Sequence, residues 1–234
     1  LKGGNFRGEH YSPLSQINED NVAELGLAWA SDLPLLDGIA TTPIVIDGVI
    51  YISGAYSIVL AVDASNGKII WTYDPKVSDA FAEKPELSWI SRASRGVGVF
   101  DGHVFATTAD CRLISINAAT GVHEWTKQTC DNAQGYSISD SPYVGGGMVF
   151  VGNAGSESYE KNRGYISAYD TDNGELVWRF YIVPSHDPAE NDTPALKMAA
   201  KTWTGDVLEK HGGGGNSWNE MTYDPISNQL FFGT

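Results

Sequence analysis

A short pattern recurs three times in this chain at an almost constant interval, and it constrains the fold more than any other feature. Each copy has an Asp or Asn, three further residues, a Gly, three more residues and a Trp. The glycines of the three copies, Gly67, Gly121 and Gly174, are separated by 54 and 53 residues. Repeats at a period of roughly 20–50 residues are usually supersecondary units that stack on their neighbours. The copies span Ala61–Trp71, Ser115–Trp125 and Ala168–Trp178.

Each repeat predicts several short antiparallel strands and no long helix. An apolar strand follows a glycine turn upstream of every copy, and the pattern itself contains a second turn between two further strands. The glycine supplies the positive φ of a tight turn, and the Trp can pack one unit against the next. We therefore predict an all-β fold, a β-propeller of four-stranded blades, with a β-sandwich of accidental Asp–Gly–Trp spacing as the alternative. The upstream strands are Val49–Ser53, His103–Thr107 and Met148–Gly152, and a fourth begins at Leu230.

The length of the chain sets the number of blades. At about 54 residues per blade, 234 residues correspond to about four blades. Propellers close with about four to eight blades, so a closed four-bladed ring and a part of a larger ring both fit. The last residue, Thr234, falls inside a predicted strand, and an open ring would leave sheet surface exposed. We therefore expect residues 1–234 to be a fragment of a single propeller domain.

The charge balance excludes some classes of partner. The chain has 29 Asp and Glu against 15 Lys and Arg, a formal net charge of −14. No cluster of basic side chains offers a footprint for phosphates, which argues against a nucleic-acid partner. No stretch approaches the roughly 18–20 consecutive apolar residues of a membrane span. We therefore expect neither a nucleic-acid partner nor a membrane span.

The two cysteines, Cys111 and Cys130, flank the predicted hairpin of the second repeat. Antiparallel pairing about a turn at 118–121 places position 111 opposite 129 or 130, within reach of a disulfide. A bridge would indicate an oxidising compartment, and two free buried thiols are the alternative. Neither these cysteines nor the 5 scattered histidines have the spacing of a zinc site.

The third repeat contains an insertion. It has eight more residues between its turn glycine and its Trp than the other two, and they fall in the segment 153–163. Gly155 and Ser156 would let a ligand approach the backbone closely. Glu157 and Glu160 are oxygen ligands of the kind that hard cations such as Ca²⁺ take. A solvated surface loop is the alternative interpretation.

Four successive glycines, Gly212–Gly215, precede a Trp that does not belong to the repeat pattern. Such a run allows the backbone to pack against something flat or crowded. The indole of Trp218 could stack on a planar ligand, or it could plug the centre of the propeller.

Taken together, these residues resemble the quinoprotein dehydrogenases that use pyrroloquinoline quinone (PQQ), and most of all the soluble quinohaemoprotein alcohol dehydrogenases. The resemblance runs along nearly the whole chain. Each piece is short, but their combination is highly specific. The pieces are Tyr11–Asn18, Thr42–Val45, Arg95–Val97, Arg163–Asp170, Val177–Tyr181, Ala199–Gly205, Tyr223–Pro225 and Leu230–Gly233.

The resemblance implies an eight-bladed propeller with PQQ and Ca²⁺ near its axis. It implies an oxidoreductase that oxidises an alcohol or a related compound by hydride transfer to the quinone. A guanidinium pairs well with the carboxylates and quinone oxygens of PQQ, Trp218 takes the position that stacks on the cofactor, and Glu157 takes that of a Ca²⁺ ligand. The implied cofactor-binding residues are Arg95, Ser139, Gly155, Ser156, Asn216 and Trp218.

The resemblance also places several functional parts after Thr234. These are the catalytic base, a second Ca²⁺ ligand and any cytochrome c domain with its haem c, so no catalytic residue is expected within this chain. An electron-acceptor protein such as a cytochrome c is the implied partner. The acidic balance and the predicted disulfide fit a bacterial periplasm.

Three departures from the family pattern bear on the substrate. Trp89 and Ile90 stand where the family usually has two adjacent cysteines, Ala40 stands where it has a PQQ-bonding glutamate, and the loop after Glu157 is two residues longer. These departures point away from an ordinary alcohol and toward an alkaloid or amine substrate, as in lupanine hydroxylase.

Two non-enzymatic interpretations remain open on the repeat alone. One is a scaffold similar to the outer-membrane assembly propellers, and the other is a lectin-like or structural propeller. The scaffold has no reason to keep Arg95, Glu157 and Trp218 together, so these three residues discriminate between a scaffold and a dehydrogenase.

Overall fold

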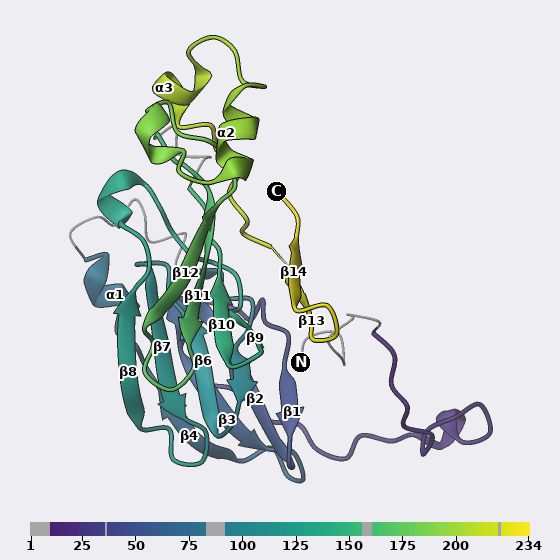
Figure 1. Ribbon diagram of the computed structural model, residues 1–234. Helices are drawn as coiled ribbons and strands as arrows, with labels where there is room; N and C mark the ends of the chain where they lie inside the picture. Colours follow the sequence, from purple (N-terminus) through teal and green to yellow (C-terminus); the bar gives the residue numbers. More distant parts are fainter. Residues whose placement is uncertain (1–9, 36, 83–91, 156–160, 220) are drawn as a thin grey trace.

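Three four-stranded antiparallel sheets follow one another along the chain and stand side by side in space (Figure 1). The computed structural model describes residues 10–35, 37–82, 92–155, 161–219 and 221–234. Within each sheet the strands lie in sequence order, so each is a propeller blade built as a simple meander. Blade 1 comprises β1 (Ile44–Ile46), β2 (Val49–Ser53), β3 (Val59–Asp63) and β4 (Ile69–Tyr73). Blade 2 comprises β5 (Gly98–Phe100), β6 (His103–Thr107), β7 (Arg112–Asn117) and β8 (His123–Gln128), and blade 3 comprises β9 (Tyr143–Gly145), β10 (Met148–Val151), β11 (Tyr165–Asp170) and β12 (Leu176–Tyr181).

A two-stranded sheet follows blade 3. It pairs β13 (Met221–Asp224) with β14 (Gln229–Phe232). Between blade 3 and this sheet lie two short helices, α2 (Pro194–Ala200) and α3 (Val207–His211), and a further helix, α1 (Val77–Ala80), follows blade 1. Within the described residues, no helix has the length and apolar character needed to cross a membrane.

The predicted all-β propeller is confirmed. The described chain contains three complete blades and one two-stranded sheet that starts a fourth, which agrees with the expected count of about four. The stretch 10–41 and most of the stretch 182–220 lie outside the blades.

Apolar side chains fill the space between successive sheets. Tyr51, Val59 and Trp71 from blade 1 share one core cluster with Val104 and Ile114 from blade 2. A second cluster joins blades 2 and 3, and a third joins blade 3 to β13 and β14. This arrangement explains why β7 and β11 are almost fully buried, since neighbouring sheets cover both of their faces. The second face of β3 is covered instead by Leu33 and Leu35 of the stretch before blade 1.

The repeated Trp and Gly contact each other across blade boundaries. Gly121 of blade 2 has φ of +71°, and a Cβ there would lie 2.7 Å from the ring of Trp71 in blade 1. The indole Nε1 of Trp71 also donates to the carbonyl of Ala118, at 2.9 Å. Trp125 packs in the same way on Gly174 of blade 3. The predicted docking of each unit on the next is therefore confirmed.

Replacing Gly121 with Ala should destabilise the fold by about 3 kcal/mol, because a left-handed φ costs about 1–2 kcal/mol and crowding of the Trp71 ring about 1–3 kcal/mol. Gly102→Ala is the matched control, since Gly102 has φ of +80° and no atom within 4 Å of its Cβ position. Denaturant-induced unfolding of both variants distinguishes backbone strain, which both share, from the loss of Trp71 packing, which only Gly121→Ala causes. Equal destabilisation by the two changes would contradict a role for the Trp contact.

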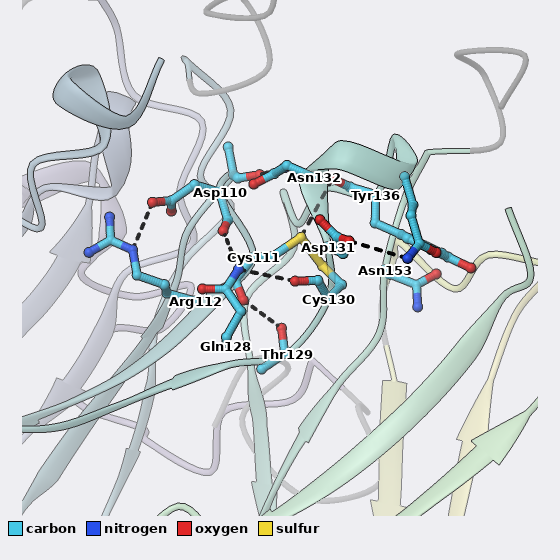
Figure 2. Close-up of a disulfide and its surroundings, with 12 residues drawn as sticks. Asp110, Cys111, Arg112, Gln128, Thr129, Cys130, Asp131, Asn132, Tyr136 and Asn153 are labelled. Atoms are coloured by element: carbon cyan, nitrogen blue, oxygen red, sulfur yellow. Dashed lines mark hydrogen bonds and ion pairs between the residues drawn. A yellow bond between two sulfur atoms is a disulfide. The ribbon is translucent and has the colours of Figure 1, made fainter. Parts of the chain in front are cut away.

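The predicted disulfide is present between Cys111 and Cys130, with the two Cα atoms 5.1 Å apart (Figure 2). Arg112 pairs with Gln128 at the end of the β7–β8 hairpin, so the bridge lies just beyond the last pair of the hairpin. The carbonyl of Cys111 accepts hydrogen bonds from both the backbone nitrogen and the hydroxyl of Thr129. The bridge thus holds the chain that leaves β8.

Candidate cofactor site

Three of the predicted cofactor residues, distant in sequence, meet in space. Nη1 of Arg95 donates to the hydroxyl of Ser139 at 2.6 Å and to its carbonyl at 3.0 Å. Cζ of Arg95 lies over the indole of Trp218, 5.2 Å from the ring centroid. Trp218 remains 42% exposed, so part of its ring is open to a ligand. The guanidinium is therefore held between a polar anchor and an accessible aromatic ring.

The backbone around Arg95 is anchored to the strand region of blade 1. The carbonyl of Arg95 accepts from the amide of Thr42 at 3.0 Å, and Thr42 forms a parallel bridge with Gly96. Gly96 has φ of +145° and faces the carbonyl of Thr42, a conformation that favours glycine. Arg95 thus lies in the segment that connects blade 1 to blade 2, whereas Ser139 lies in the segment that connects blade 2 to blade 3.

Gly155 lies beside the segment that leads to Ser139. Ser137 and Ala154 form an antiparallel bridge with hydrogen bonds of 3.1 and 2.8 Å. Gly155 has φ of +137° and packs against the side chain of Asn162. The start of the insertion and the segment that carries Ser139 are therefore held together by backbone bonds.

The four-glycine run packs against blade 3 through backbone atoms. Gly214 accepts from the amide of Gly164 at 2.7 Å and donates to the carbonyl of Asn162 at 3.1 Å. A Cβ on Gly164 would overlap the carbonyl of Gly215, and a Cβ on Gly152 would overlap that of Ser217. We call these contacts of Gly152 and Gly164 with residues 214–217 the glycine seam. The prediction that the glycines allow close backbone packing is confirmed.

Asn216 and Ser217 leave polar atoms unpaired inside the protein. Nδ2 of Asn216 donates to Oδ1 of Asn153 at 2.5 Å, but its own Oδ1 is buried and has no hydrogen-bond partner among the described residues. The hydroxyl of Ser217 is likewise buried and has no hydrogen-bond partner among the described residues. Buried polar atoms are almost always paired, so these two indicate a partner other than the described side chains. Asn153 was not among the predicted site residues, and its one signal in the sequence was its place at the start of the inserted segment.

Several predicted positions lie outside the described residues. They are Ser156, Glu157, Trp89 and Ile90. Ala40 is described and exposed, two residues before Thr42. Over the described part of the chain, no three His, Cys, Asp or Glu side chains gather in a group that could hold a metal ion.

A polar cavity of about 730 Å³ lies between the outer strands of blades 2 and 3, next to Cys130, and sequence analysis did not predict it. Burial raises the pKa of Tyr165 well above its ordinary value and lowers that of Arg163. Burial also lowers the pKa of Arg179, but the neighbouring hydroxyls of Tyr165 and Tyr169 outweigh it and the net shift is upward. Both arginines stack on tyrosine rings, at 3.9 and 4.0 Å. Arg95, Ser139 and Trp218 do not line this cavity.

The geometry around Arg95 defines the class of ligand. An accessible indole face favours a planar ring, and a guanidinium beside it favours carboxylate or quinone oxygens. The buried, unpaired atoms of Asn216 and Ser217 add two places for hydrogen bonds. These residues fit a flat, anionic cofactor such as PQQ, and they define a propeller protein with a ligand site at the passages between its blades.

Comparison with known proteins agrees with this class. The family described as "PQQ: Glucose/ethanol/alcohol dehydrogenase, beta-propeller domain" matches residues 2–234. The chain belongs to this family. It is 45% identical over 232 residues to quinohemoprotein alcohol dehydrogenase ADH IIB of Pseudomonas putida, and 37% identical over 236 residues to lupanine 17-hydroxylase [cytochrome c] of a Pseudomonas species.

Solved structures give the same result. The structure of quinohemoprotein alcohol dehydrogenase ADHIIG from Pseudomonas putida HK5 matches 99% of this chain with a TM-score of 0.89 and 40% identity. A europium-containing methanol dehydrogenase matches 98% with a TM-score of 0.80 and 28% identity. The match covers 99% of this chain with ADH IIB and 100% with lupanine 17-hydroxylase, but only 33% of each relative. It covers 33% of the ADHIIG chain and 41% of the methanol dehydrogenase chain. This chain therefore spans about a third of the length of the curated relatives.

Proposed function

We propose that residues 1–234 are the N-terminal part of the propeller domain of a PQQ- and calcium-dependent dehydrogenase that oxidises an alcohol. The observation that carries the proposal is the meeting of Arg95, Ser139 and Trp218. A non-enzymatic scaffold has no use for an arginine held over an exposed indole. Membership of the family and the quinohemoprotein relatives support the same conclusion.

The residues of this chain bind and orient the cofactor in this proposal. PQQ, when bound, supplies the acceptor of the hydride and thus the redox chemistry. Arg95 pairs with its oxygens, Trp218 provides the flat surface, and Ser139 holds the guanidinium in place. Gly155 and Ser156 bring backbone close to the ligand, and Asn216 offers its buried Oδ1.

Calcium is the proposed metal, with Glu157 as a ligand. Hard cations prefer carboxylate oxygens, and Glu157 follows closely on Gly155 in the inserted loop. A similar solved structure is named as a europium-containing methanol dehydrogenase, which supports a cation site in this family. The catalytic base and a second metal ligand are proposed to follow Thr234.

An alcohol is the proposed substrate class, and a cytochrome c the proposed electron acceptor. Identity to the alcohol dehydrogenase ADH IIB, at 45%, exceeds that to lupanine 17-hydroxylase, at 37%. Ala40, in place of the family's PQQ-bonding glutamate, keeps an alkaloid or amine as the second candidate. The quinohemoprotein relatives support a haem c domain in the whole protein, and the disulfide supports a periplasmic location.

Reconstitution of the whole protein tests this function. The protein that carries this chain is freed of cofactor and metal, and dye-linked oxidation is then measured with alcohols and with lupanine-type amines. We expect alcohol oxidation only when both PQQ and Ca²⁺ are added. Activity that is independent of PQQ, or no activity with either substrate class, would overturn the proposal.

A further inference from the structure

Two buried amide side chains link the loop of Trp218 to blade 3. Asn153 lies two residues after the end of β10, is 1% exposed, and donates from Nδ2 to the carbonyl of Tyr165 at 3.1 Å. Its Oδ1 accepts from Nδ2 of Asn216 at 2.5 Å. Asn216 is two residues before Trp218, and Asn153 is two residues before Gly155. The amide pair therefore joins two predicted parts of the cofactor site.

The carbonyl of Tyr165 fixes the orientation of both amides. A carbonyl only accepts, so Asn153 must turn its Nδ2 toward Tyr165 and its Oδ1 toward Asn216. Asn216 must then donate from Nδ2, which leaves its Oδ1 directed away from the pair. This explains why that oxygen is buried without a partner among the described residues.

The glycine seam and the amide pair contribute differently to the position of Trp218. The seam brings two backbones into contact because Gly152 and Gly164 have no Cβ. Such packing contacts do not orient any side chain. The hydrogen bond from Asn216 to Asn153 is directional. It crosses the seam only two residues before Trp218.

We propose that Asn153 is a positioning residue of the cofactor site. Through Asn216 it fixes the indole of Trp218 relative to Gly155, and it turns Oδ1 of Asn216 toward the ligand. Asn153 itself does not touch the ligand. This inference rests on the proposed function, since it assigns a role within the same PQQ site.

Titration of the whole, cofactor-free protein with PQQ in the presence of Ca²⁺ tests this role. Asn153→Ala should weaken PQQ binding roughly tenfold or more, the usual size of an effect from a residue that orients a ligand-binding group. Asn153→Ser, which is too short to reach Asn216 but keeps a polar group, should have a similar effect if the alanine variant folds poorly. Asn191→Ala is the matched control, because Asn191 is also a buried amide, bonded to the backbone of Ser185. It should lower the melting temperature and leave the dissociation constant of PQQ unchanged.

Measuring the same substitution in a second variant protein distinguishes a positioning role of Asn153 from a general loss of structure. In a protein that carries both Trp218→Ala and Asn216→Ala, Asn153→Ala should change PQQ affinity less than twofold, because both groups that it positions are gone. An equal loss in both backgrounds, or unchanged affinity of Asn153→Ala with a wild type that binds PQQ, would overturn the inference. A wild type that does not bind PQQ would instead overturn the proposed function.

Discussion

Replacing Arg95 with methionine should weaken PQQ binding about 100-fold, because it removes charge-assisted hydrogen bonds worth about 1.5–3 kcal/mol from the site. The side chain is bonded to Ser139 and lies over Trp218, so it already stands beside the ring on which the ligand is proposed to stack. The PQQ affinity of Arg95→Lys should lie between that of the wild type and that of Arg95→Met, since an ammonium keeps the charge but not the planar fork of donors. Calorimetric titration of the whole, cofactor-free protein with PQQ measures all three.

Arg112→Met is the control for this prediction. Arg112 is also partly buried, but it pairs with Asp110 and with the carbonyl of Pro75, away from Arg95. Its replacement should leave the affinity for PQQ unchanged. Equal losses from Arg95→Met and Arg112→Met would contradict a specific role of Arg95 and point to overall charge.

Removal of the disulfide should lower the free energy of unfolding by about 3 kcal/mol. The bridge joins residues 19 apart, and closing a loop of this size restricts the unfolded chain by about that amount in the chain-entropy account. The variant replaces both Cys111 and Cys130 with serine, which leaves no free thiol among the described residues. Guanidinium-induced unfolding of the oxidised wild type and of the variant measures the difference.

The reduced wild type is the control for the serine variant. Both lack the bridge, so their midpoints should agree and both should lie below that of the oxidised protein. A loss of less than 1 kcal/mol in both would mean that the β7–β8 hairpin and the bonds of Thr129 already hold this end of blade 2.

The repeat was predictable because each of its signals is local. The strands Val49–Ser53 and His103–Thr107 are observed as predicted, and the third ends at Val151, one residue early. A glycine at positive φ and a Trp four residues after it act within one unit or on the next. The pairing of Cys111 with Cys130 followed from the centre of one hairpin turn in the same way.

Contacts that depend on distant parts of the chain were not predictable from the pattern. Trp29 lies outside the repeats, yet it packs on Gly67 and donates to the carbonyl of Ala64. Trp71 makes the equivalent contacts with Gly121 and Ala118 of blade 2. The helices in the stretch 182–220 have no repeat partner, so periodicity gave no signal for them. Asn153 resembles any polar residue at a strand end until Asn216, 63 positions away, is placed beside it.

The candidate site was predictable in part, and for a different reason. Arg95 and Ser139 were predicted from the family resemblance alone, and Trp218 also from its place after the four glycines. The structure brings all three together. No local rule connects them, since 79 residues separate Ser139 from Trp218. The polar cavity around Arg163 and Arg179 has no counterpart in the resemblance, because residues from several separate segments come together only in the folded chain to line it.

A structure of the whole protein reconstituted with PQQ and Ca²⁺ tests the central claim most directly. The account predicts that the cofactor lies on the indole of Trp218, with Arg95 at its oxygens and Oδ1 of Asn216 directed toward it. A bound cofactor elsewhere in the propeller, with Arg95 still over a bare Trp218, would contradict the account.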